Sequence, residues 1–175
     1  MAIVGVRRRV RRSPARAFRL AFLVAVTVLA QTLVFPHLRV FGVVPDVGLV
    51  LAVAVAYTDG PETGALFGFA EGLAIDLFVN TPFGLSAFAF AVTAYLVGAL
   101  EAGLVRTSRW MPLGLAAGAG VVSGGLFVVV GAIFGQEQLF ELDSVRIVAI
   151  AAAYDAVIAP VCFPLARWAL APPRP

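Results

Sequence analysis

Lysine is missing from this chain, and all 13 of its basic residues are arginines. Charged residues of both signs make up only 13% of the 175 positions, whereas a soluble domain averages about 25%. Cysteine and histidine occur once each, so no intramolecular disulfide is possible and these residues do not predict a metal site. The scarcity of charge indicates that most of the surface does not face water.

The motifs of common catalytic and phosphate-binding sites are also missing. The chain has no GxxxxGK[ST], HExxH or CxxC pattern and no serine–histidine pair within one motif. We therefore expect no enzyme activity, no catalytic residue, no cofactor and no metal ligand. The basic tail, residues 1–17, lacks the interleaved aromatic side chains of a nucleic-acid-binding surface, so no nucleic-acid partner is expected.

Long hydrophobic runs take up most of the sequence, which is 61% hydrophobic with a mean hydropathy of +0.98. The predicted class is an all-α polytopic membrane protein with six transmembrane helices. Residues 1–17 are predicted to be a cytoplasmic tail, residues 18–170 the six-helix transmembrane domain and residues 171–175 a second short cytoplasmic tail. The six apolar runs lie at about 18–35, 45–58, 62–79, 85–105, 112–134 and 145–168.

The arginines predict the orientation of these helices. With the N-terminus inside the cell, 11 of the 13 arginines would be cytoplasmic, and only Arg39 and Arg146 would lie outside. Loops on the cytoplasmic side of a membrane protein carry an excess of basic residues. The sequence therefore predicts that both termini are cytoplasmic, and that the first helix is an uncleaved anchor.

Residues 61–85 form the stretch around which we expect the chain to be organised. Glycines recur every fourth residue at Gly64, Gly68 and Gly72, and Asp76 stands at the next step. On a helix these positions form one row, which we call the glycine row, where missing side chains let another backbone come close. The row predicts tight helix packing, either within the protein or against the helix of a partner.

Three acidic residues, Glu71, Asp76 and Asp155, fall inside predicted membrane helices with no basic residue there to pair with them. A charge at the bilayer centre costs at least about 2.5–3.5 kcal/mol, so these acids should be protonated, hydrogen-bonded or exposed to a polar cavity. One interpretation is a proton- or solute-transport site. The other is a structural bond or a dock for a partner, which is favoured for Asp76 because it lies close to the predicted outer surface.

Pro45 and Asp46 open the second predicted helix. Proline suits the first helical position, and an acid suits the first turn, where it meets the positive end of the helix dipole. Helix capping is thus one explanation of Asp46, and a functional role is the other. Gln31, near the outer end of the first predicted helix, could bond a neighbouring helix or meet lipid headgroups.

Several of these residues together resemble the MreD family of rod shape-determining membrane proteins. The resemblance rests on Pro45-Asp46, on G-x-x-x-G-F-x-x-G-L-x-x-D from Gly64 to Asp76, and on Pro82-x-Gly84. Tyr154-Asp155 followed by Pro160 is similar to the family's Tyr-Asn…Pro element, with aspartate in place of the usual asparagine. The resemblance covers about residues 18–168.

The resemblance implies a non-enzymatic subunit of the bacterial elongasome in the inner (cytoplasmic) membrane, supporting peptidoglycan synthesis and rod cell shape. The implied partners are an MreC-like bitopic protein, the RodA glycosyltransferase, a class B penicillin-binding protein, MreB and membrane lipids. The family is also similar in fold to the S-components of energy-coupling-factor transporters, so the alternative is a substrate-binding subunit of a vitamin or small-solute transporter. The candidate residues for partner binding or helix packing are Pro45, Asp46, Gly64, Gly68, Glu71, Gly72, Asp76, Pro82, Gly84, Tyr154 and Asp155.

Overall fold

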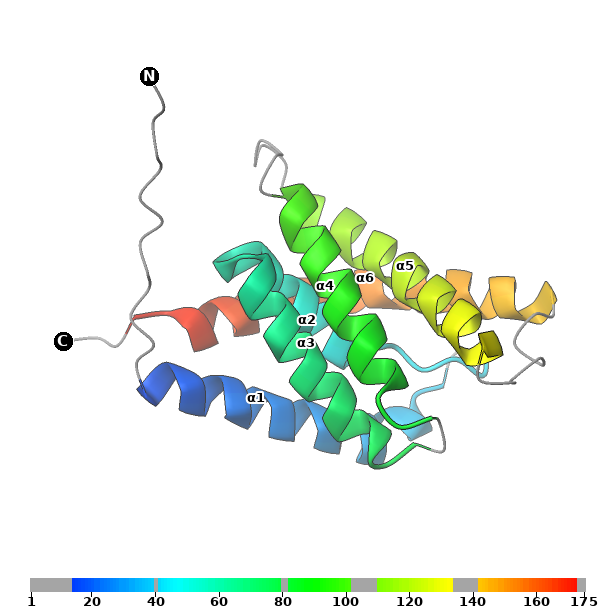
Figure 1. The fold of residues 1–175 in the computed structure, drawn as a ribbon, viewed down its shortest axis with the longest axis horizontal. Helices are drawn as coiled ribbons and strands as arrows, with labels where there is room; N and C mark the ends of the chain where they lie inside the picture. The colour runs from blue at the N-terminus through cyan, green and yellow to red at the C-terminus, as the bar shows by residue number, and fades with distance from the viewer. Residues whose placement is uncertain (1–13, 40, 80–81, 102–109, 134–141, 173–175) are drawn as a thin grey trace, which may run out of the picture.

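The computed structural model describes residues 14–39, 41–79, 82–101, 110–133 and 142–172. Within these ranges the fold is all-helical, and its six α-helices correspond one to one to the predicted apolar runs (Figure 1). The first 13 residues of the predicted basic tail and the last three residues of the chain lie outside the described ranges. The helices are α1 (Pro14–Leu33), the short 3-10 helix η1 (Phe35–His37), α2 (Val47–Asp59), α3 (Pro61–Asp76), α4 (Leu85–Glu101), α5 (Met111–Ile133) and α6 (Leu142–Leu170).

Three of the described helical segments are long and apolar enough to cross a membrane, namely Pro14–His37, Met111–Ile133 and Val145–Leu170. Helices α2 and α4 are apolar but shorter, and α3 has only 16 residues. The 13 residues of α2 extend about 20 Å, whereas the hydrocarbon core of a bilayer is roughly 30 Å thick. The architecture is therefore that of a helical bundle of the membrane-protein type, and α2 is too short to cross the whole hydrocarbon core.

Helix α2 is the centre of the bundle and contacts each of the other five α-helices. Every residue from Gly48 to Ala56 is buried, as expected of a helix that is apolar on all sides. Helix α3, in which we expected the organising stretch, packs against α2 and α4 instead of occupying the middle. The core is built around α2, and the glycine row of α3 joins that core to α4.

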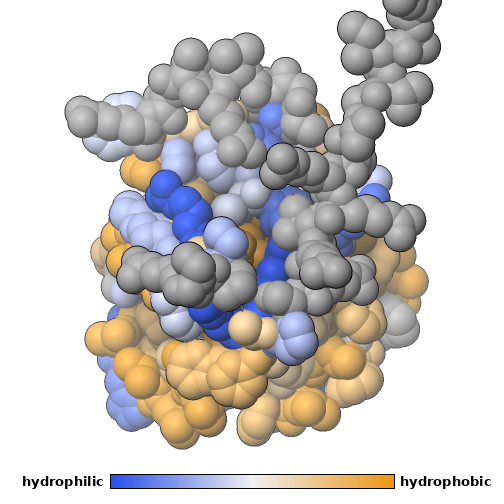
Figure 2. All heavy atoms as spheres, turned by 90° about the vertical axis from the view of Figure 1, so that its left-hand side faces the viewer, coloured by the Kyte–Doolittle hydropathy of each residue, from blue (hydrophilic) through white to orange (hydrophobic). Residues whose placement is uncertain are grey.

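The start of α1 and the end of α6 lie at one end of the bundle, on the left of Figure 1, together with the turn between α2 and α3. We call this the terminal end, and the opposite end, where α1 and α3 finish, the loop end. Figure 2 looks onto the terminal end, where hydrophilic residues gather in the middle and hydrophobic residues cover the flank below. A polar end beside an apolar flank is what a boundary between water and membrane requires.

Candidate functional site

The first turn of α2 is surrounded by polar groups that come from α1 and α6. The Asp46 N–H donates to Asp155 Oδ1 at 2.8 Å, and the Gly48 N–H donates to Gln31 Oε1 at 3.4 Å. Gln31 Nε2 donates in turn to Asp46 Oδ1 at 3.0 Å and to the Pro45 carbonyl at 3.2 Å. Helix starts leave backbone N–H groups without partners, and lipid offers no acceptors for them. Side chains of two other helices supply the acceptors here.

This arrangement corrects the predicted role of Pro45. Helix α2 begins at Val47 with Asp46 as its N-cap, so Pro45 lies before the first helical position rather than in it. Asp46 does stand at the helix start, but its side chain makes no capping hydrogen bond to α2. The Asp46 carboxylate instead accepts a hydrogen bond from Gln31. The N–H groups at the start of α2 are capped by side chains of α1 and α6, not by the side chain of Asp46.

Tyr154 and Asp155 fix the middle of α6 against the same region. Asp155 is only 1% exposed, and the neighbouring Tyr154 hydroxyl donates to the Leu38 carbonyl at 3.2 Å. Gly120 of α5 leaves room for the acid, because a Cβ there would lie 2.8 Å from Asp155 Oδ2. An asparagine oxygen could accept the same bond from α2, so this contact requires an acceptor rather than a charge.

Asp76, at the end of α3, supplies acceptors to the start of α4. Its Oδ2 accepts the Gly84 N–H at 2.8 Å and the Ala87 N–H at 3.4 Å, while Oδ1 accepts the Ser86 N–H at 3.3 Å. The side chain is buried, with 5% exposure. Asp76 therefore holds the start of α4 from outside that helix, through three backbone amides.

Pro82 and Gly84 shape the turn that presents these amides. The Pro82 carbonyl accepts the Leu85 N–H at 3.0 Å, and the Gly84 carbonyl accepts the Phe88 N–H at 2.9 Å. Gly84 has φ +93°, a backbone conformation that glycine adopts without steric cost. These two residues of the resemblance thus serve the local geometry of the Asp76 contact.

The glycine row of α3 is filled by the chain's own helices. A Cβ at Gly64 would lie 2.2 Å from Ala56 Cβ of α2, and one at Gly68 would lie 2.9 Å from a carbonyl oxygen of α4. At Gly72, a Cβ would lie 2.5 Å from the backbone of Ala87. Real Cβ atoms essentially never show contacts this short. The row is an internal packing face, and a partner helix would have to approach the bundle elsewhere.

Glu71 lies against the start of α2 without a hydrogen bond. It is fully buried, and neither carboxyl oxygen has a hydrogen-bond partner among the described residues. A Cβ at Gly48 would lie 2.6 Å from Glu71 Cγ, so Gly48 makes the room that this side chain occupies. The positive end of the α2 dipole favours an acidic group at this place. No spacing in the sequence pointed to Gly48.

Glu71, Asp76 and Asp155, the three acids predicted to lie inside the membrane, thus share one type of environment, the start of a helix; a fourth buried acid, Glu101, ends α4 instead. Asp155 and Glu71 meet the start of α2, and Asp76 meets the start of α4. In the part of the chain that the structure describes, no group of three or more His, Cys, Asp or Glu side chains is placed to hold a metal ion. Asp76 and Asp155 accept hydrogen bonds from backbone amides of other helices and so fix these helices relative to one another, whereas Glu71 makes no such bond.

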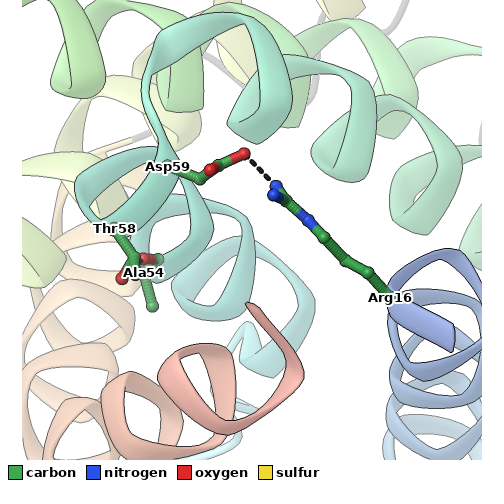
Figure 3. Close-up of polar contacts among 4 residues, drawn as sticks. All are labelled: Arg16, Ala54, Thr58 and Asp59. Atoms are coloured by element: carbon green, nitrogen blue, oxygen red, sulfur yellow. Dashed lines mark hydrogen bonds and ion pairs between the residues drawn. The ribbon is translucent and has the colours of Figure 1, made fainter. Parts of the chain in front are cut away.

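Two arginines make further contacts between helices at the terminal end, which were not expected from the sequence. Arg16 of α1 forms an ion pair with Asp59 at the end of α2 (Figure 3). The two side chains are only 12% and 16% exposed. The Arg19 guanidinium lies 5.6 Å from the ring centroid of Trp168 and donates to the Ala171 carbonyl at 3.1 Å. The charge pattern used these two arginines only to predict membrane orientation. The structure shows that they also connect α1 to α2 and to the end of α6.

Comparison with known proteins connects this bundle to a family. The family model described as rod shape-determining protein MreD matches residues 11–167 of the 175-residue chain. No curated protein and no solved structure matches it. The matched range contains both buried helix starts and every residue that supplies acceptors to them.

Proposed function

The chain belongs to the MreD family of rod shape-determining proteins, and we propose that it is a non-enzymatic membrane subunit of the bacterial elongasome. In this role it binds an MreC-like bitopic protein and supports lateral peptidoglycan synthesis and rod cell shape. The RodA glycosyltransferase, a class B penicillin-binding protein and MreB are engaged directly or through the MreC-like protein. The observation that carries the proposal is the family match over nearly the whole bundle.

The environment of the buried acids supports an adaptor rather than a carrier. Asp76 and Asp155, two candidates for a transport site, accept hydrogen bonds from the backbone of their own chain. Acids engaged in this way fix helices in place, which suits a protein that presents a constant surface to its partners. Since most of the described residues lie in helices, that surface consists of helix faces and short loops.

Co-purification tests the proposed function. A tagged copy, solubilised in mild detergent from a rod-shaped host, should recover an MreC-like bitopic protein, and an unrelated polytopic protein with the same tag should not. Depletion should turn the rods round and release the MreC-like protein from the synthases. Recovery of a coupling ATPase pair, tight binding of a vitamin and unchanged cell shape would together contradict the adaptor and favour the transporter.

The proposed topology has six membrane-spanning helices, with the terminal end in the cytoplasm and the loop end outside. The charge pattern supports this orientation, because it leaves only Arg39 and Arg146 outside. The fold is compatible with it, because the start of α1 and the end of α6 lie at the same end of the bundle (Figure 1). The location is then the inner membrane, where an MreC-like partner would also be anchored.

Single cysteines should report this orientation. His37 in η1 and Glu62 in the first turn of α3 are both exposed, whereas the native Cys162 is 2% exposed and should add little background. A membrane-impermeant maleimide should label His37→Cys in intact cells and Glu62→Cys only after the membrane is opened. Labelling of Glu62→Cys together with protection of His37→Cys would reverse the proposed orientation.

A further inference from the structure

A groove runs between the start of α5 and the last turns of α6, apart from the buried helix starts. It forms an open pocket of about 220 Å³. Leucine, phenylalanine and proline side chains form most of its wall, and an arginine and a tryptophan complete it. The lining residues are Trp110, Pro112, Leu113, Pro160, Phe163, Pro164 and Arg167.

The floor of the groove is apolar and packs against α2. Phe163 is 2% exposed, and its ring packs edge-on against Tyr57 of α2 with 5.4 Å between the ring centroids. Pro160 and Pro164 lie within α6 and have no backbone N–H to offer to a polar ligand. A surface of this kind favours a hydrocarbon chain.

The rim of the groove is positively charged. Arg167 is exposed, and the hydrogen bond from its Nε to the Phe163 carbonyl, at 3.4 Å, uses one of the five donors of the guanidinium. No acidic side chain in the described ranges forms an ion pair with Arg167. The first turn of α5 borders the groove with the positive end of its dipole. Trp110, 65% exposed, is the type of residue found at membrane interfaces.

We propose that this groove binds one anionic phospholipid, with the phosphate on Arg167 and an acyl chain over Phe163 and Leu113. Charge complementarity selects the occupant, because a positive rim above an apolar floor matches an amphiphile with a negative head. A pocket of about 220 Å³ holds a chain segment but not a partner helix, which is about 10–12 Å wide. The site is independent of the proposed adaptor function and of which side of the membrane the terminal end faces.

Tryptophan fluorescence can test this site with a probe that the chain already carries. The chain has two tryptophans, so Trp168→Phe leaves Trp110, at the groove, as the reporter. The full-length protein is placed in phosphatidylcholine vesicles that contain a small fraction of brominated phosphatidylglycerol or brominated phosphatidylcholine. The anionic lipid should bind about fivefold more tightly, the increment expected for one arginine near a membrane surface, and should quench Trp110 accordingly.

Arginine variants then test whether Arg167 is responsible for the preference for anionic lipid. Arg167→Gln should abolish it, and Arg167→Lys, which keeps the charge, should retain most of it. Arg146→Gln is the matched control, because it removes the same charge from an exposed position near the other end of α6. Measurement on purified protein without partners keeps the result separate from the co-purification experiment.

Three results would overturn the lipid site. One is equal quenching by the two lipids when Arg167 is present. Another is a preference that survives Arg167→Gln, or one that Arg146→Gln removes to the same extent. Failure of both lipids to quench Trp110 would mean that protein rather than lipid covers the groove.

Discussion

Gly72→Leu should prevent the protein from accumulating in the membrane. A Cβ at Gly72 would lie 2.5 Å from the Ala87 Cα and N atoms, which belong to the backbone of α4. That backbone cannot withdraw without also breaking the hydrogen bonds of Asp76 to the start of α4. Overpacking a well-packed core typically costs about 1–3 kcal/mol, and a leucine against backbone should exceed this range. The steady-state level in membranes should fall several-fold or more, as measured by in-gel fluorescence of a fusion.

Gly118→Leu is the matched control for this substitution. Gly118 lies on the exposed face of α5, and nothing is within 4 Å of the place where its Cβ would be. The same side chain should therefore be tolerated there, with a level and a thermal midpoint close to those of the unchanged protein. Gly72→Ala should fall between the two. Normal accumulation of Gly72→Leu would mean that α3 and α4 do not approach as closely as the structure shows.

The positions of the helices could be predicted because each apolar run is a local property of the sequence. Which helix lies at the centre, and which helices pack against one another, could not be predicted in the same way. Helix α2 is apolar on all sides and buried from Gly48 to Ala56, so its residue pattern does not indicate which side faces which neighbour. A helix of this kind can occupy the centre only if the other five surround it, which depends on contacts distant in sequence.

The glycine row likewise shows that local spacing predicts close packing but does not identify the packing partner. A spacing of four predicts that some backbone comes close, because all three glycines fall on one side of the helix. It does not identify that backbone, and the row in fact meets two different helices. Gly64 faces α2, whereas Gly72 faces α4. Similarly, Gly48 could be recognised as the space for Glu71 only once α2 and α3 were placed side by side.

The acids differ in how far apart their contact partners are in the sequence. Asp76 reaches Gly84, eight residues later, and the turn residues between them already indicated a helix start nearby. Asp155 meets the Asp46 N–H across 109 residues, and no local pattern connects the two. The sequence therefore left transport and structural roles open for Asp155, while it favoured a structural or docking role for Asp76.

Asp76→Leu should be about as damaging as Gly72→Leu, because it leaves the Gly84, Ser86 and Ala87 amides without their acceptor. A buried polar group that loses its partner costs about 1–3 kcal/mol, so the loss at three amides is comparable with a large part of a typical protein's total stability. Glu62→Leu is the control, since it removes an exposed acid from the other end of the same helix. Its membrane level should stay near that of the unchanged protein.

Asp76→Asn separates the acceptor role of this residue from proton transfer. Asparagine keeps the shape of the side chain and one acceptor oxygen, so it can still hold part of the α4 start, but it cannot exchange a proton. If Asp76 is a bonding group, Asp76→Asn should accumulate well, co-purify with the MreC-like partner and restore much of the rod shape to depleted cells. The leucine variant should fail in all three measurements. Loss of function in Asp76→Asn, with a normal membrane level and normal partner recovery, would instead indicate an acid that must titrate, and would favour transport.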